Sequence, residues 1–302
     1  MLSVAVAGDV PAPDLAVFAA EEAIKRSGHE PAEFAGLFHS PVHFQGPEGW
    51  SAAHYILDRT LGTPVGAVEI RQGCLGMLTS MRPAAGLLMA APEQPAYLLT
   101  AADNFGTPIV DRWRAATHYL PADGGSSVVL SRRSGFARLP AVGSVSNPAA
   151  EILHRGGEPL FPPGITVGRR LDIEARARYW QEQWAQGVLP PTIHLGDLVT
   201  EAANRTLAEA RLASSDIARV ATSGVVWTHV KHGVLEPLGF DESQSTWEFT
   251  RRLGHAGGTD QIAGLEYLLE EGAVGPGDHV LMVSVTVGME VGCAVVEITD
   301  TP

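Results

Sequence analysis

The chain repeats one pattern at a distance of 183 residues, and this repeat restricts its fold more than any other feature. A helical pattern opens at Asp14 and leads into an apolar run at residues 35–38; the same pattern opens again at Asp197. With this offset Ala19 matches Ala202 and Ile24 matches Leu207. Both copies predict a capped helix, a short loop and a buried strand.

The repeat extends further along both copies. With nearly the same offset, to within two positions, Gly-Cys-Leu-Gly at residues 73–76 matches Gly-His-Ala-Gly at residues 254–257. An apolar helix and then a strand follow each of these turns, at residues 77–90 and 96–100 in the first copy and at residues 262–270 and 279–285 in the second. Two duplicated α/β halves, packed in layers, are therefore expected, with equivalent loops meeting near a pseudo-twofold axis. The active site should draw on both halves.

The predicted halves cover residues 1–145 and 146–302. The segment 132–189 is richer in Gly, Pro and Arg and less periodic. It is expected to hold a linker and peripheral helices, such as one at residues 173–186.

Composition excludes several classes of protein. The net charge of -13 over 302 residues disfavours binding to nucleic acid or to an anionic membrane surface. No apolar stretch approaches the roughly 20 residues of a membrane span, and the N-terminus lacks the basic start of a signal peptide. A cytoplasmic protein is expected. The two cysteines should be separate thiols, with Cys293 packed in an apolar strand.

Cys74 is the candidate nucleophile. Residues 69–77 predict a strand end, a tight turn and a helix whose first turn carries the thiol. Unpaired amides and the helix dipole at that position favour the thiolate, which is the nucleophilic form. The alternative interpretation is a buried cysteine at a helix start. The repeat favours the nucleophile, because it places polar residues at the matching turn of the other half.

His229 is the candidate general acid or base. Residues 225–232 (Val-Val-Trp-Thr-His-Val-Lys-His) predict a strand of the second half whose end presents two histidines. An imidazole near an acylated thiol can hold the thiolate and then deprotonate an acceptor. His232 is interpreted as a neighbour in the outer part of the site. A surface or structural histidine is the alternative.

Two glycine-rich segments add further candidates. Asp260 stands at the opening of a helix, where it is expected to orient His229 or to accept the acceptor's proton. The alternative interpretation is an N-cap, and the two roles are compatible. His255, in the same segment, is a second candidate for the outer part of the site. Gly288 interrupts an apolar strand, and its amide, with that of Cys74, is expected to form an oxyanion hole; a plain turn is the alternative.

In their order, these motifs resemble the ketoacyl synthase III group of the thiolase superfamily. Residues 73–76 resemble its nucleophile turn, residues 120–128 its Gly-Asp-Gly-Ala strand entry, Thr228-His229 its Pro-His, and residues 288–294 its closing glycine-rich strand. The resemblance implies a thiolase-like fold with layers α-β-α-β-α. The family usually has a leader region before the first repeated helix, which is expected to be shortened or missing here.

The departures from the family favour acyl transfer over condensation. Condensing members use Cys, His and Asn, whereas Ala256 stands at the expected Asn position and His232 replaces another Asn. The pattern Gly-His-x-Gly-x-x-Asp at residues 254–260 resembles the acyltransferase branch, which implies Cys74, His229 and Asp260 as catalytic residues. A carboxylate would repel the enolate of decarboxylation but strengthen a histidine base.

The resemblance implies a donor thioester on coenzyme A or on the phosphopantetheine of an acyl carrier protein. The acceptor would be a hydroxyl or amine of a small intermediate of secondary metabolism, as in polyketide or antibiotic biosynthesis. No permanently bound cofactor and no metal are expected. A condensing enzyme and a non-catalytic scaffold that binds a carrier protein remain alternatives; release of carbon dioxide would indicate the first, and absence of an acyl adduct on Cys74 the second.

The resemblance also implies a homodimer, and the apolar strand at residues 96–100 is compatible with pairing across a twofold axis. A basic patch for an acidic carrier protein is expected to involve Arg82, Arg112 and Arg114.

Overall fold

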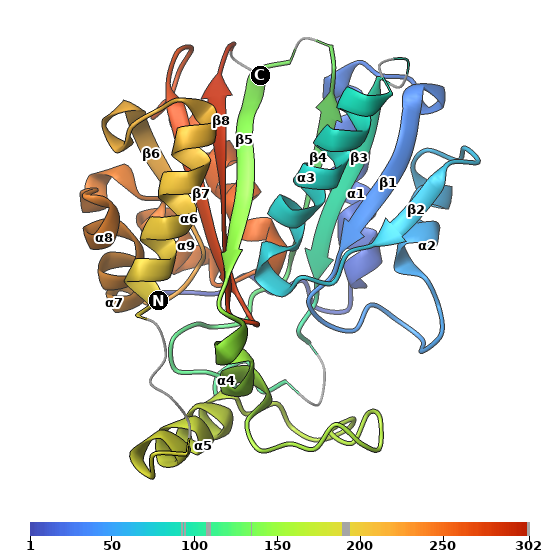
Figure 1. The fold of residues 1–302 in the computed structure, drawn as a ribbon. Coiled ribbons are helices and arrows are strands. Elements are labelled where there is room, and N and C mark those ends of the chain that lie inside the picture. The colour runs from blue at the N-terminus through green and yellow to red at the C-terminus, as the bar shows by residue number, and fades with distance from the viewer. Residues whose placement is uncertain (92, 94, 107–109, 134, 189–193, 301–302) are drawn as a thin grey trace.

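The computed structural model describes residues 1–302 except 92, 94, 107–109, 134, 189–193, 301 and 302. The described residues form two four-stranded sheets (Figure 1). The strands of the first are β1 (Phe34–Ser40), β2 (Gly66–Glu69), β3 (Ala96–Asp103) and β4 (Gly124–Ser131). Those of the second are β5 (Ala137–Ser146), β6 (Ile217–Thr222), β7 (His279–Thr286) and β8 (Glu290–Ile298).

The two sheets share the topology of three strands, to which the first sheet adds β2 beside β1 and the second adds β5 beside β8. Their orders are β2-β1-β3-β4 and β5-β8-β7-β6. In each sheet a parallel pair, β1 with β3 or β6 with β7, continues into an antiparallel pair, β3 with β4 or β7 with β8. The predicted strands at residues 96–100 and 279–285 are confirmed as β3 and β7.

Helices cover both sheets and separate them. The first half contributes α1 (Ala12–Ser27), α2 (Ala52–Arg59) and α3 (Gly76–Ala90), followed in the chain by α4 (Glu151–Arg155) and α5 (Ile173–Ala185). The second half contributes α6 (Leu195–Ala210), α7 (Trp227–Val230), α8 (Glu236–Leu238), α9 (Trp247–Leu253) and α10 (Asp260–Glu270). None of the helices among the described residues has the length and apolar character needed to cross a bilayer.

The layers follow from which helix face is apolar. In Figure 1, α1 and α2 lie on the outer face of the first sheet, α6 on the outer face of the second, and α3 between the sheets. The central core joins α3 to α10, because Leu78 and Met81 belong to the same buried cluster as Leu265 and Leu268. Burial of such apolar area is the main stabilising contribution to the fold. The predicted α-β-α-β-α architecture is confirmed.

The repeat is visible in the element boundaries. The same 183 positions separate Ala12 from Leu195 at the starts of α1 and α6, and Phe34 from Ile217 at the starts of β1 and β6. By sheet membership the chain passes from one half to the other between β4 and β5. The predicted boundary after residue 145 therefore falls inside β5, a strand that pairs with β8 of the second sheet.

Residues 147–188 lie outside the two sheets, below them in Figure 1. Helix α5 forms where the sequence predicts a peripheral helix, with Asp172 as its N-cap accepting a hydrogen bond from the Ala175 amide at 2.8 Å. None of its described residues is fully buried. This α4–α5 segment is therefore a cover on the layered body.

The prediction of a strand at residues 225–232 is wrong. Helix α7 begins at Trp227 and continues as a π-helical turn, Lys231–Leu235, into α8. Val230 and Val234, four residues apart, both pack in the core cluster of the second half, so the helical period buries them. The β-branched residues Val225 and Val226 precede the helix instead of opening a strand.

Candidate active site

Cys74 lies in a tight turn between β2 and α3, in the 3₁₀ turn Gly73–Leu75. The turn needs glycine at position 73, where φ is 53° and where a Cβ atom would collide with the Thr286 hydroxyl. The second half holds this turn from β7: Ser284 Oγ donates to the Cys74 carbonyl at 2.9 Å, and Thr286 Oγ1 to the Gln72 carbonyl at 3.0 Å. Both halves therefore position the thiol.

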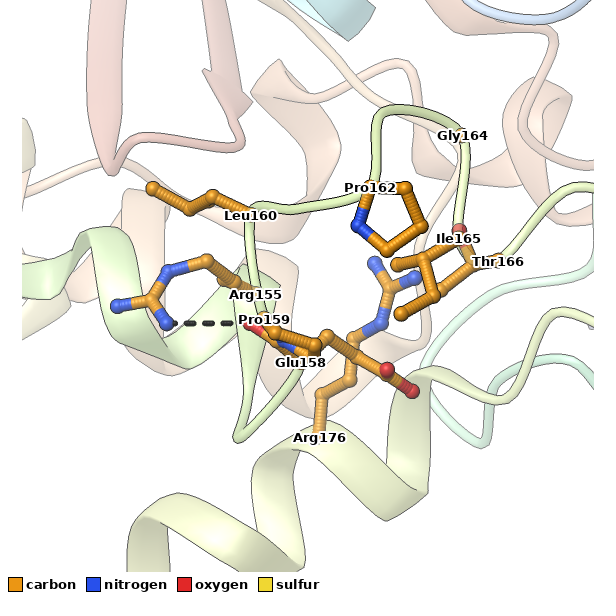
Figure 2. A pocket seen from close by; sticks show the side chains of 9 residues that line it. All are labelled: Arg155, Glu158, Pro159, Leu160, Pro162, Gly164, Ile165, Thr166 and Arg176. Carbon is orange, nitrogen blue, oxygen red and sulfur yellow. Dashed lines mark hydrogen bonds between the residues drawn. The ribbon is translucent and has the colours of Figure 1, made fainter.

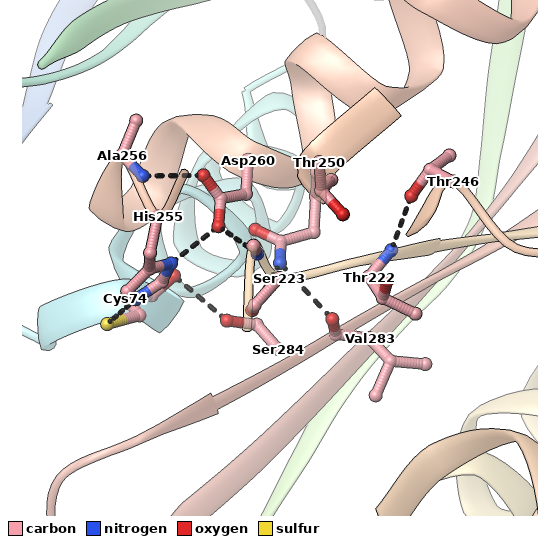
Figure 3. A network of polar contacts seen from close by, with 12 residues as sticks. Cys74, Thr222, Ser223, Thr246, Thr250, His255, Ala256, Asp260, Val283 and Ser284 are labelled. Carbon is pink, nitrogen blue, oxygen red and sulfur yellow. Dashed lines mark hydrogen bonds and ion pairs between the residues drawn. The ribbon is translucent and has the colours of Figure 1, made fainter. Parts of the chain in front are cut away.

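A chain of hydrogen bonds runs from Cys74 through His255 to Asp260 (Figure 3). Cys74 Sγ lies 2.8 Å from His255 Nε2, and His255 Nδ1 lies 2.5 Å from Asp260 Oδ2. Asp260 also accepts the amide of Ala256 at 2.8 Å and that of Gly224 at 2.7 Å. These hydrogen bonds hold the Asp260 carboxylate in one orientation, and the carboxylate in turn orients the His255 imidazole.

Electrostatics in this chain favour a charged imidazole. Burial lowers the pKa of His255, but the adjacent Cys74 and Asp260 more than offset it, and the pKa lies well above its usual value. Only 6 % of His255 is exposed, and Asp260 is fully buried, so solvent screens the pair weakly. A protonated imidazole beside the sulfur stabilises a thiolate.

The structure does not bring His229 into this chain. Asp260 pairs with His255, so the prediction that Asp260 orients His229 is wrong. The His229 ring stacks on His118 instead, with centroids 5.4 Å apart, and burial lowers its pKa. The physical reason is local: His229 stands on the helix α7, not at the end of a strand.

The two residues assigned to the outer part of the site lie in different settings. His255 contacts the sulfur directly. His232 is exposed, and its Nδ1 lies 2.6 Å from Glu236, one helical turn on. Its described partner is therefore a surface carboxylate.

The amide of Gly288 is already engaged. It lies in the turn between β7 and β8 and donates to His154 Nδ1 at 3.3 Å. A carbonyl oxygen could use this amide only after His154 yields it. The oxyanion hole of Cys74 and Gly288 stays a prediction.

Sequence reasoning missed the polar wall beside the nucleophile. Tyr119 packs edge-on against His255, with centroids 5.0 Å apart, and burial together with Cys74 raises the pKa of its phenol. His118 packs on Tyr119 and lies 3.7 Å from Glu174 of α5, which also accepts from the Thr117 amide at 2.9 Å. No motif marks these residues in the sequence; the aromatic pair His118-Tyr119 just before a glycine-rich strand entry was the available signal.

The glycine-rich strand entry at residues 120–128 has a structural role, through Asp123. Arg112 is buried and pairs with Asp123 at 2.9 Å. The prediction that Arg112 belongs to a surface patch for a carrier protein is therefore wrong, whereas Arg82 and Arg114 are exposed.

Comparison with known proteins connects this geometry to a family. The model of the C-terminal part of 3-oxoacyl-[acyl-carrier-protein] synthase III matches residues 207–298. Among solved structures, ChlB3, described as an acyltransferase, is 42% identical with a TM-score of 0.92, over 99% of this chain and 88% of that one. A search among curated proteins gave no match.

More distant structures share the fold. 3-oxoacyl-[acyl-carrier-protein] synthase III from Aquifex aeolicus VF5 is 17% identical with a TM-score of 0.76, over 97% of this chain and 86% of that one. OleA from Xanthomonas campestris, solved with lauric acid and lauroyl-CoA, is 16% identical with a TM-score of 0.74, over 98% and 85%.

The fold and the turn of Cys74 define a thiolase-like protein of the acyl-transfer and condensing class. The chain belongs to the ketoacyl synthase III-like family of the thiolase superfamily.

Proposed function

We propose that the protein is an acyltransferase that carries an acyl group on Cys74 from a thioester donor to a hydroxyl or amine. The hydrogen-bonded chain from Cys74 through His255 to Asp260 supports this proposal more than any other observation. It is the arrangement in which a base holds a nucleophile and a third group orients the base.

In the first half-reaction the Cys74 thiolate attacks the donor's thioester carbonyl. A carbon–sulfur bond forms to Cys74, the bond to the donor sulfur breaks, and His255 gives its proton to the departing thiolate. The backbone amide of Cys74 stabilises the oxyanion between these two events. The products are the acyl-enzyme and a free thiol.

In the second half-reaction the now neutral His255 takes the proton of the acceptor's O–H or N–H. The acceptor attacks the acyl carbon, the bond to Cys74 breaks, and the thiolate faces a protonated His255 again. Asp260 stabilises the imidazolium each time it forms. Proton and charge therefore return to their starting state, and ping-pong kinetics are expected.

The environment of His255 favours transfer over condensation. The side chain that fixes it is a carboxylate, and the residues that follow, Ala256, Gly257 and Gly258, carry no amide side chain. A carboxylate near the substrate disfavours the enolate that decarboxylation produces, but raises the basicity of the histidine. The condensing alternative predicts carbon dioxide release from a malonyl thioester, which we do not expect.

We propose coenzyme A or an acyl carrier protein as the donor, a small natural-product intermediate as the acceptor, and a cytoplasmic homodimer as the working form, with no permanent cofactor. ChlB3, an acyltransferase at 42% identity, supports the reaction class. Pairing of subunits through β3 is wrong, since β1 and β4 flank this strand. β2 and β4 are the two edge strands of this sheet, and an edge strand is where pairing with a second subunit could occur. Light scattering would measure the mass in solution.

The deciding experiment is to incubate the protein with a panel of carrier-protein and coenzyme A thioesters, without acceptor, and to record intact and peptide mass spectra. An acyl mass on the Cys74 peptide that is absent from Cys74→Ala supports the proposal. If no thioester labels Cys74 in a folded protein, the proposal fails and the scaffold alternative replaces it.

A further inference from the structure

The hydroxyl group of Tyr119 has no hydrogen-bond partner among the described residues. The Tyr119 ring is half-buried and packs edge-on against His255, with centroids 5.0 Å apart. A tyrosine in such a setting normally bonds through its hydroxyl, because a phenol taken out of water without a partner costs free energy. The oxygen is not sealed inside the protein either. The free hydroxyl is thus available to a bound molecule.

The backbone on either side of Tyr119 is held by the second half. The His118 carbonyl accepts the Val226 amide at 2.8 Å, and the Leu120 carbonyl accepts the His255 amide at 2.9 Å. The segment that carries the phenol is therefore bonded directly to the residue that carries the base. Groups fixed in this way are preorganised, so they need not rearrange during the reaction.

Tyr119 and Cys74 contact the same imidazole. Cys74 Sγ lies 2.8 Å from His255 Nε2, and the Tyr119 ring packs on the same side chain. Burial raises the pKa of the Tyr119 phenol, and the charge of Cys74 raises it further. Two charges of α5 have smaller effects, since Arg176 lowers this pKa and Glu174 raises it. The phenol therefore keeps its proton beside the thiolate and offers an O–H donor.

The second donor expected for the oxyanion is engaged elsewhere. The Gly288 amide donates to His154 Nδ1 at 3.3 Å. Helix α5 holds His154 in turn, because Arg176 Nη1 donates to the His154 carbonyl at 2.8 Å. Figure 2 shows the Arg176 side chain rising from α5 towards the loop that carries Ile165, where it borders a cavity of about 300 Å³. The α4–α5 segment thus keeps His154 on Gly288, and the Cys74 amide lacks a second donor from this turn.

We propose that the Tyr119 hydroxyl is the second hydrogen-bond donor to the oxyanion that forms during acyl transfer at Cys74. This inference rests on the proposed function and adds a catalytic residue to it. When the thiolate attacks, a bond forms between Cys74 Sγ and the carbonyl carbon, and the π electrons of the carbonyl move to its oxygen. The Cys74 amide and the Tyr119 O–H both donate to that oxygen. The carbonyl forms again as the thiolate of the donor leaves, and the phenol keeps its proton throughout.

A phenol suits this role for a physical reason. A hydrogen bond to a charged oxygen is about twice as strong as one between neutral groups. The O–H of Tyr119 therefore gains most when the charge develops, and a bond that strengthens in the transition state accelerates the reaction. Transfer to the acceptor passes through the same kind of oxyanion, so Tyr119 should act in both half-reactions.

The first test removes only the hydroxyl. Tyr119→Phe should slow acylation of Cys74 by about 10²- to 10³-fold, the usual effect of losing one oxyanion donor. The probe is acetyl-CoA, or the thioester of the panel that labels wild type fastest, and rapid-quench mass spectrometry of the Cys74 peptide gives the rate. Tyr267→Phe is the matched control, since this half-buried tyrosine of α10 stacks on Phe249. An acylation rate of Tyr119→Phe within about threefold of wild type would overturn the proposal.

Alkylation separates an oxyanion donor from a residue that supports the thiolate. Iodoacetamide reacts with the Cys74 thiolate at a saturated carbon, so no oxyanion forms. Tyr119→Phe should therefore be alkylated within about twofold of the wild-type rate at each pH. Its urea midpoint should also stay unchanged, because the lost hydroxyl has no partner among the described residues. An equal loss in alkylation and in acylation would mean that Tyr119 acts through His255 or the thiolate, and would contradict an oxyanion role.

The rival donor is tested by His154→Ala, which frees the Gly288 amide but keeps the backbone carbonyl that Arg176 binds. We expect this variant to acylate Cys74 at nearly the wild-type rate. Faster acylation by His154→Ala, together with no effect of Tyr119→Phe, would assign the oxyanion to Gly288 and refute the role of Tyr119.

Failure of the proposed function is recognised on the wild type alone. Iodoacetamide would then label Cys74, whereas no thioester of the panel would, and the oxyanion role would fall together with acyl transfer. An acylated wild type with an equally fast Tyr119→Phe would instead refute the role of Tyr119 and leave the acyltransferase proposal standing.

Discussion

Cys74 Sγ and His255 Nε2 lie 2.8 Å apart although 181 positions separate the two residues in the chain. They stand at equivalent places in the duplicated turn, each preceded by a glycine and followed two residues later by another. The pseudo-twofold packing of the halves brings the two turns together: a Cβ at Gly258 would lie 3.4 Å from the Met77 amide nitrogen. Duplication has thus produced a nucleophile in one copy and its base in the other.

The first prediction separates the two candidate bases. His255→Gln should slow acylation of Cys74 by about 10²- to 10⁴-fold, the usual contribution of a positioned acid or base. His229→Gln should leave the rate of this half-reaction within about threefold of the wild-type rate. The reason is that the structure shows His229 stacked on His118, whereas Asp260 and the thiol are bonded to His255. Rapid-quench mass spectrometry of the acyl-enzyme measures both rates. A reversed order would restore His229 as the base.

The sequence predicted what depends on local signals. The capped helix, turn and strand of each repeat follow from apolar periodicity and turn residues, and α1, β1, α6 and β6 appear where expected. It misassigned residues 225–232, since β-branched Val225 and Val226 favour a strand locally while burial of Val230 and Val234 requires a helix.

The pairing within the site depends on tertiary packing. From the sequence, Asp260 was paired with His229, and His255 was assigned to the outer part of the site. The repeat contained the better signal, because it aligned His255 with Cys74 itself. Glu174 and Arg176 were not predicted, since nothing local indicates that α5 folds back over the site.

The second prediction concerns the pH dependence of stability. The pKa of His255 is raised in the folded protein, so its contribution is fully present below the unfolded value of about 6.5 and is lost as the pH rises through the folded value. Asp260→Asn removes a buried partner and should cost about 3–5 kcal/mol where His255 is charged. Urea unfolding at several pH values measures the free energy of unfolding of Asp260→Asn and of wild type. The difference between the two should be largest at about pH 6 and smaller in alkali. A difference that grows in alkali would contradict this sign.

The third prediction concerns Asp103, a buried carboxylate at the end of β3. Burial raises its pKa to about 7, although the amides of His43 and Val42 donate to it and both His255 and Arg71 lower the value. The folded state then holds a proton that the unfolded state releases, so this group lowers stability as the pH rises from about 4 to about 7.

Asp103→Asn removes that titration. The unfolding free energy of wild type relative to the variant should fall by about 1.4 kcal/mol per pH unit within this window and stay level above it. Urea unfolding of both proteins measures the difference. A difference that does not change with pH would show that Asp103 is ionised throughout.

The last prediction tests how the second half holds the nucleophile turn. Gly73→Ala places a methyl group against the Thr286 hydroxyl and forces alanine to a φ of 53°. Left-handed backbone costs about 1–2 kcal/mol and overpacking about 1–3 kcal/mol more. Thr286→Ala removes the hydroxyl. The double variant should therefore regain the stability lost to overpacking but keep the loss caused by the left-handed backbone. A double-mutant cycle by chemical unfolding separates the two. Full additivity would mean that Gly73 and Thr286 do not meet, and that β7 does not support the turn of Cys74.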